Sequence, residues 1–72
     1  MMTPLDSSVL KGCEYFPLPM RLVLLFTSGE LYEYSEASEE LYQGLLAAES
    51  KGRFFRENIR GRLPYRRLSR RP

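Results

Sequence analysis

Histidine is absent from this 72-residue chain, and cysteine occurs only once, at Cys13. Without histidine and with one thiol, the chain lacks the side chains of the common zinc sites, and a single cysteine cannot form an internal disulfide. We therefore expect no metal, no cofactor and a reducing, cytoplasmic location. No imidazole can activate Cys13, so the sequence favours a buried, inert thiol over a nucleophile.

Long hydrophobic runs are also missing. The longest apolar run covers residues 22–26, whereas a helix needs roughly 20 apolar residues to span a bilayer. The N-terminus has no basic region followed by a hydrophobic stretch, as a secretory signal would. The sequence therefore predicts neither export nor a membrane partner, and its length predicts one small domain.

No catalytic constellation is present either. The only cluster of carboxylates, formed by Glu36, Glu39 and Glu40, falls in a predicted helix start that faces solvent. Nothing there raises the pKa of a carboxylate for acid–base chemistry. We expect a binding protein rather than an enzyme, with no catalytic residues.

Charge is distributed very unevenly. Residues 51–72 contain nine Lys or Arg and one acid, whereas residues 1–50 contain two bases and eight acids, within a net charge of +2. A concentrated cationic segment is typical of a surface that meets phosphates or another polyanion.

The first half of the chain predicts three strands, at residues 8–15, 21–26 and 31–34. The first has an imperfect alternation in which Gly12 suits a bulge. Residues 16–19 contain two prolines and must form a connection. The second and third strands are joined by turn residues around Gly29 and form a hairpin.

Two helices are predicted after the hairpin. Ser35 and Ser38 are candidate N-caps of the first, whose Leu41 and Leu45 share an apolar face. Ser50 is the candidate N-cap of the second. There, the members of the apolar face are Phe55 and Ile59, and the C-terminal stop is Gly61.

The fold class predicted from these elements is α+β, a three-stranded antiparallel sheet followed by two helices packed on one face, with a basic C-terminal tail. Residues 1–6 are assigned to an N-terminal arm and residues 7–63 to the folded domain. Residues 64–72 are assigned to the tail, which we expect to be extended unless Tyr65 and Leu68 pack back onto the domain.

Several short motifs occur together in a fixed order. They are Ser7-Ser8, Tyr15, Phe26-x-x-Gly29-x-x-Tyr32-x-Tyr34, Ala48-x-Ser50-x-Gly52-x-x-Phe55 and Ile59-Arg60. In this combination the chain resembles the KTSC domain, a family named for an extension of some lysyl-tRNA synthetases and also found as small bacterial and phage proteins. The resemblance implies a compact α+β unit and an RNA-binding role, and it supplies no catalytic residues. The chain departs from the family pattern at Ala37-Ser38, where Val-Pro is usual, and at Leu63, where tyrosine is common.

The basic segment supplies the candidate nucleic-acid contacts. Its cations are almost all arginine, whose planar guanidinium binds phosphate through two hydrogen bonds and stacks on bases. The candidates are Lys51, Arg53, Arg56, Arg60, Arg62, Arg66 and Arg67, with Arg70 and Arg71 further along the tail. This favours a small module that binds nucleic acid, most readily RNA. The alternatives are a solvated face without a ligand, ion pairs with the acidic helix start of the same or a neighbouring molecule, and an adaptor that docks an acidic partner protein.

Tyrosines supply the candidate base-stacking residues. Tyr32 and Tyr34 are two positions apart on a strand and so share one face, as do the aromatic residues of several RNA-binding sheets. Tyr65 is a third candidate. The alternative is that the helices cover this face and that Tyr32 and Tyr34 are core residues.

Overall fold

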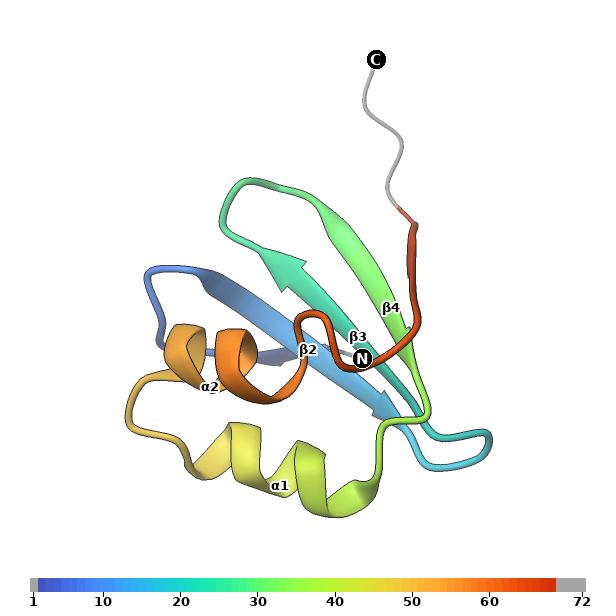
Figure 1. Ribbon diagram of the computed structural model, residues 1–72. Coiled ribbons are helices and arrows are strands. Elements are labelled where there is room, and N and C mark those ends of the chain that lie inside the picture. The colour runs from blue at the N-terminus through green and yellow to red at the C-terminus, as the bar shows by residue number, and fades with distance from the viewer. Residues whose placement is uncertain (1, 69–72) are drawn as a thin grey trace.

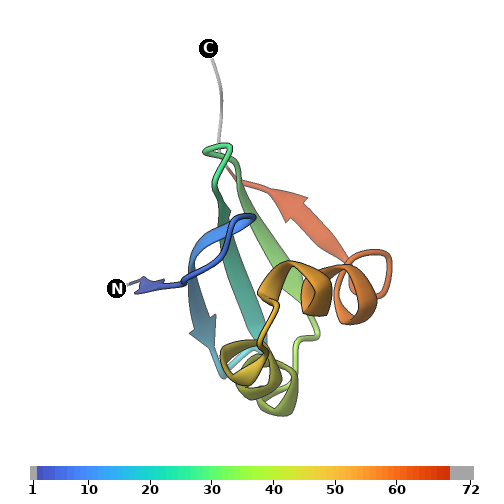
Figure 2. The ribbon, with the colours of Figure 1, turned by 90° about the vertical axis from the view of Figure 1, so that its left-hand side faces the viewer.

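The computed structural model describes residues 2–68, which form an antiparallel sheet and two helices (Figure 1). The elements are β1 (Thr3–Pro4), β2 (Leu10–Phe16), β3 (Arg21–Phe26), β4 (Leu31–Ser35), α1 (Glu39–Ala47), α2 (Lys51–Asn58) and β5 (Tyr65–Arg67). Both helices lie on the same side of the twisted sheet (Figure 2). No helix in the described part of the chain is long and apolar enough to cross a membrane.

The sheet has five strands in the order β1-β2-β3-β4-β5, so the expected three-stranded sheet is wrong, although the α+β class is correct. One added strand, β1, pairs Thr3 with Cys13 and Pro4 with Gly12 at an edge of the sheet. Two residues, one of them proline, are too few to show an alternating pattern, and proline is confined to edge positions because it lacks an N–H.

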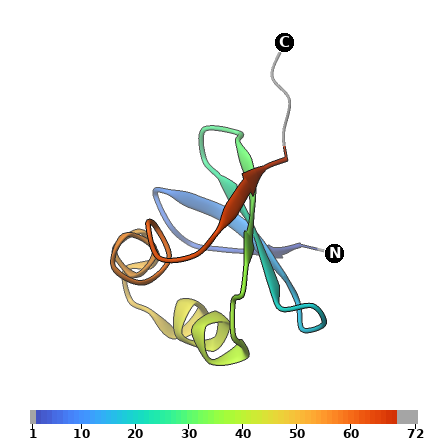
Figure 3. The same ribbon diagram turned by 45° about the vertical axis from the view of Figure 1, so that its right-hand side comes forward.

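The other added strand, β5, runs beside β4 at the opposite edge (Figure 3). Arg66 lies opposite Glu33, and its Nη2 atom is 3.1 Å from the Glu33 Oε1 atom. Backbone hydrogen bonds from Ser35 N–H to the Pro64 carbonyl (2.9 Å) and from Leu68 N–H to the Leu31 carbonyl (2.7 Å) border the strand. A strand anchored by charge and by backbone hydrogen bonds shows no apolar alternation, so the sequence predicts a tail at these residues.

The central hairpin agrees with the sequence. β3 and β4 pair as Leu22 with Tyr34 and Leu24 with Tyr32, and Gly29 takes a positive φ of 98° in the turn. The pairing of β2 with β3 shifts register between Leu10 and Gly12, which confirms the bulge there.

Of the candidate serine caps, Ser38 and Ser50 are confirmed, whereas Ser35 is the last residue of β4 and caps no helix. The Ser38 hydroxyl accepts a hydrogen bond from Leu41 N–H (3.1 Å), and the Ser50 hydroxyl accepts one from Arg53 N–H (3.3 Å). Each satisfies one of the free N–H groups at a helix start. After α2 ends, Gly61 turns the chain back toward the sheet with a φ of 74°.

The core fills the space between the helices and one face of the sheet. Its fully buried large side chains are Leu10, Leu22, Leu24, Leu45 and Ile59, together with Cys13. α1 and α2 approach closely at Gly44, where a Cβ atom would come within 2.9 Å of the Phe54 ring. The apolar faces predicted for the helices therefore do point into the core.

Candidate functional site

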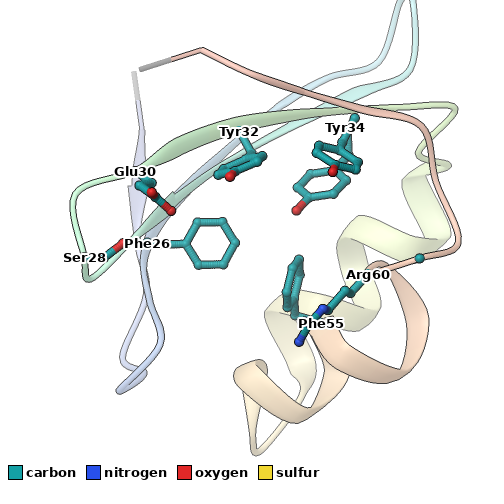
Figure 4. Close-up of a pocket in the computed structure, with 9 residues that line it drawn as sticks. Phe26, Ser28, Glu30, Tyr32, Tyr34, Phe55 and Arg60 are labelled. Carbon is teal, nitrogen blue, oxygen red and sulfur yellow. The ribbon is translucent and has the colours of Figure 1, made fainter. Parts of the chain in front are cut away.

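An open pocket of about 550 Å³ lies between the sheet and the end of α2 (Figure 4). The β3–β4 hairpin, β5 and the turn after α2 contribute its walls. The lining residues are Phe26, Ser28, Glu30, Tyr32, Tyr34, Phe55, Arg60, Gly61 and Tyr65. Small-ligand sites are lined mainly by apolar and aromatic side chains with a few polar groups, and this pocket has such a lining.

Aromatic rings form the floor of this pocket. Tyr32 lies 5.6 Å from Tyr65 and 6.3 Å from Tyr34, measured between ring centroids. Phe55 packs edge-on against Phe26 at 5.2 Å and against Tyr34 at 5.8 Å. Such edge-on and offset contacts stabilise aromatic clusters beyond simple burial. The structure thus brings the three candidate stacking tyrosines into one cluster.

The three tyrosines differ in exposure. Tyr34 is only 5% exposed and belongs to the core, Tyr32 is half-buried, and Tyr65 is 64% exposed. Tyr32 and Tyr34 share a face because side chains two positions apart on a strand point to the same side. Tyr65 joins them because it lies opposite Tyr34 in the β4–β5 pairing. A ligand in the pocket would meet mainly Tyr65 and the accessible part of Tyr32.

Burial raises the pKa of Tyr34 to about 12, and the neighbouring hydroxyls of Tyr32 and Tyr65 add to this rise. The Arg60 guanidinium acts in the opposite direction, because it stabilises a nearby phenolate. The Tyr34 hydroxyl therefore stays protonated at neutral pH and remains a hydrogen-bond donor.

The predicted cations fall into two groups. Each cation of the first group already interacts with another residue of the molecule. The Lys51 ammonium donates hydrogen bonds to the Leu46 and Ala48 carbonyls at the end of α1, at 3.2 and 2.8 Å. Arg53 pairs with Glu57 one helical turn away at 3.2 Å. The side chains of Lys51 and Arg53 therefore already have partners at the helices.

Both charged residues of β5 are also paired, but on opposite faces of the sheet. Arg66 shares the Glu33 carboxylate with Arg21, whose Nη1 atom is 3.3 Å from Glu33. Arg67 lies on the pocket face, 3.8 Å from the Glu30 carboxylate. Arg66 therefore faces away from the pocket that Tyr65 lines.

The second group consists of Arg56, Arg60 and Arg62. Their side chains are exposed and have no ion-pair partner among residues 2–68. In that range no ion pair joins the acids at the start of α1 to the arginines of α2, so the alternative of pairing within the molecule is not seen there. Arg70 and Arg71 lie outside the described residues.

The two ends of the pocket have opposite charge. Glu30 and Ser28 come from the hairpin side, and Arg60 comes from the turn after α2, with the rings between them (Figure 4). This arrangement suits a ligand with a flat middle, hydrogen-bond donors at one end and an anion at the other.

Sequence reasoning missed the pocket residues outside the tyrosines. Phe55 was recognised only as a core residue, and Phe26 only as a strand residue. A signal did exist for Phe26, which shares a strand face with Leu24 opposite Tyr32. Nothing in the sequence marks Glu30 as a pocket residue, because charged residues are common in turns.

Metal chemistry has no candidate site in the described part of the chain. No three His, Cys, Asp or Glu side chains gather there to hold an ion. Cys13 is fully buried, and burial raises the pKa of its thiol. A thiol that is both protonated and inaccessible is a poor ligand and a poor nucleophile.

Comparison with known proteins identifies the family. The KTSC domain model matches residues 6–65, and the chain belongs to the KTSC domain family. The structure superimposes on the crystal structure of a KTSC domain protein from Yersinia pestis with a TM-score of 0.92, at 30% identity, covering 96% of this chain and 97% of that one.

Two curated relatives differ greatly in length. A protein of Tsukamurella paurometabola is 45% identical over 53 residues, which cover 74% of this chain and 79% of the relative. A lysine–tRNA ligase of Nostoc sp. is 36% identical over 64 residues, covering 89% of this chain but only 11% of the ligase. The same unit therefore occurs in small proteins and inside a much larger enzyme.

Proposed function

We propose that this KTSC domain is a non-catalytic module that binds RNA, with a base stacked in the aromatic pocket and phosphates held by nearby arginines. The observation that carries the proposal is that Tyr65, 64% exposed, and Arg60 line the same open pocket. A ring and a cation in one pocket are the two components that single-stranded nucleic-acid sites combine.

Stacking is supported by the arrangement of the rings. Tyr65 is held by its pairing opposite Tyr34, so its ring is positioned before a ligand arrives. Tyr32 and Tyr34 support it from behind, at 5.6 and 5.9 Å. Stacking one base on such a ring contributes about 1–3 kcal/mol.

Phosphate binding is supported by the arginines that have no ion-pair partner within residues 2–68. Arg56, Arg60 and Arg62 follow one another along the end of α2 and its turn, and each has an exposed guanidinium. Because they make no ion pair among residues 2–68, no such pair has to break when they bind phosphate. Arg53 can add to this surface by exchanging the Glu57 carboxylate for a phosphate, whereas Arg67 stays beside Glu30. Lys51 and Arg66 are less available.

A relative supports RNA as the polymer. One protein that contains a region similar to this chain is named lysine–tRNA ligase, and a tRNA is part of that name. Because this chain covers 11% of that ligase, the inference concerns only the shared unit.

A salt titration tests the proposal. Binding of a fluorescent, U-rich 12-nucleotide RNA is measured by anisotropy between 50 and 300 mM salt. Three to five arginine–phosphate contacts predict that log affinity falls against log salt with a slope of about −2 to −3.5 for a single strand. A flat response, or no binding at the lowest salt, would refute RNA binding through these arginines.

Two matched substitutions locate the site. Arg60→Gln should weaken binding by about tenfold, whereas Arg66→Gln, which removes the same charge from the opposite face, should change affinity by less than about twofold. Equal losses would indicate a diffuse charge effect rather than a site at the pocket.

The rival function is an adaptor that docks an acidic protein partner. Poly-L-glutamate carries the negative charge but has no bases to stack. Under our proposal Tyr65→Ala weakens RNA binding by about tenfold and leaves poly-L-glutamate binding unchanged. If Tyr65→Ala affects neither ligand and the two bind equally well, the surface is better described as a dock for acidic proteins.

A further inference from the structure

We propose that the aromatic pocket prefers guanine, and that the Glu30 carboxylate reads the base. This inference rests on the proposed RNA-binding function and adds a ligand specificity to it. Its starting point is the opposite charge of the two pocket ends, with Glu30 at one end and Arg60 at the other (Figure 4).

Glu30 is held at its place by the hairpin turn. The Glu30 carbonyl accepts a hydrogen bond from Phe26 N–H (2.9 Å), and the Phe26 carbonyl accepts one from Gly29 N–H (2.8 Å). These two bonds fix the backbone of Glu30 beside the backbone of Phe26. Its side chain is 41% exposed and lines the pocket, so a bound base can reach the carboxylate.

Within the described residues, Glu30 has one ion-pair partner, Arg67. Arg67 approaches one carboxylate oxygen, Oε2, at 3.8 Å, a distance longer than a hydrogen bond. The carboxylate therefore keeps acceptor capacity for a ligand, since an ionised carboxylate offers about four lone-pair sites. An additional pair of donors can bind without breaking the contact with Arg67.

Guanine is the base whose edge suits such an acceptor. Its N1–H and N2–H groups are adjacent, parallel donors that can bind both oxygens of one carboxylate. Adenine offers one amino donor beside an acceptor nitrogen, cytosine does the same, and uracil places a single N–H between two carbonyls. Each of the other three bases would direct at least one acceptor at the negative charge, which is unfavourable.

Arg60 sets the direction in which a nucleotide lies. The guanidinium at the far end of the pocket attracts a phosphate, and the Glu30 carboxylate repels one. A nucleotide therefore enters with its base toward the hairpin and its phosphate toward the end of α2, and its flat base rests on the rings between them. The same charge arrangement that orients the nucleotide also brings the guanine edge to Glu30.

The test compares single-base changes in one RNA. Pentanucleotides UUGUU, UUAUU and UUIUU, where I is inosine, are titrated against the whole chain at 50 mM salt. We expect UUGUU to bind about tenfold more tightly than UUAUU, in line with a two-bond contact to a base edge. Inosine lacks the N2 amino group and should fall between them.

A substitution of Glu30 tests whether this residue causes the preference for guanine. In Glu30→Ala the three pentanucleotides should bind within about twofold of one another, whereas Glu40→Ala, an exposed acid on α1 that does not line the pocket, should keep the full preference for UUGUU. Overall affinity in Glu30→Ala is not the readout, because removing a negative charge favours every RNA.

Equal binding of UUGUU and UUAUU to the unmodified chain would overturn the guanine preference while leaving RNA binding intact. A preference that survives Glu30→Ala would assign the reading of the base to another residue and also overturn the proposal. If none of the pentanucleotides binds while the longer U-rich RNA does, the pocket is not a base site and the inference fails. Absence of all RNA binding refutes the proposed function as well.

Discussion

The two faces of strands β4 and β5 differ in role, although successive residues of each strand point to alternate faces. On one face Tyr32, Tyr34 and Tyr65 form part of the core and the pocket. On the other, Glu33 is only 14% exposed because Arg21 and Arg66 flank it. Adjacent residues of β5 thus serve a candidate binding site and a structural ion pair.

The comparison shows that a count of charges does not identify a binding surface. Four of the seven predicted contacts within the described residues already have partners in the molecule, namely Lys51, Arg53, Arg66 and Arg67. The other three, Arg56, Arg60 and Arg62, follow α2 to the turn after it, and Arg60 lines the pocket. Three predictions test how different the two faces are, beginning with the largest effect.

Two neighbouring leucines on β3 allow a direct comparison of the packing on the two faces of the sheet. Leu24 is fully buried toward the helices, and Leu25 is half-buried on the outer face. Leu24→Ala should lower the free energy of unfolding by about 3 kcal/mol through lost burial and a cavity. Leu25→Ala should cost about 1 kcal/mol, because part of that side chain already meets water.

Urea denaturation measures both variants, with the slope against urea checked for constancy. Losses of equal size would show that the outer face is packed as tightly as the face under the helices, and would remove the contrast.

Alkaline pH probes the pocket face through Tyr34. Its pKa is raised to about 12, whereas an unfolded tyrosine ionises near the usual value of about 10. The stabilisation is complete below pH 10 and is lost as pH rises from 10 to 12, because the unfolded chain releases its proton first. The expected loss is about 2 kcal/mol across that interval.

Tyr34→Phe isolates this contribution, since phenylalanine does not titrate and the other tyrosines are common to both proteins. The difference in unfolding free energy between the two proteins is measured from pH 8 to 12. Parallel curves above pH 10 would mean that Tyr34 is not shielded by the fold as described.

The outer face is tested by Glu33→Gln, the smallest effect of the three. It removes a carboxylate shared by two arginines that are 42% and 67% exposed, so we expect a cost of about 1 kcal/mol or less. The loss should be local, with faster hydrogen exchange at the Leu68 amide that closes β5 onto β4.

Glu57→Gln is the matched control, because the Arg53–Glu57 pair is exposed on one helix and contributes about 0.3 kcal/mol. Unchanged exchange at Leu68 in Glu33→Gln would show that backbone pairing alone holds β5.

Much of the fold could be predicted because its signals are local. The caps at Ser38 and Ser50, the turn at Gly29 and the bulge near Gly12 each depend on a few consecutive residues. The apolar spacing of Leu41 and Leu45 likewise depends only on helical geometry.

The edges of the sheet could not be predicted in the same way. β1 is too short for a pattern, and β5 is held by partners far away in sequence, since Arg66 follows Glu33 by 33 positions. For the candidate site, the tyrosines and arginines could be proposed from their types. The contributions of Phe26, Glu30 and Phe55 required knowledge of which elements meet.

The sequence by itself therefore determined the hairpin, the two capped helices, the faces that they bury and the concentration of arginine near the end of the chain. These features follow from backbone chemistry and from spacing between near neighbours. Only the tertiary structure decided which arginines are paired, which tyrosine is exposed, and where a carboxylate and a guanidinium face each other across aromatic rings. Those properties depend on distances between residues remote in sequence, which a linear pattern does not contain.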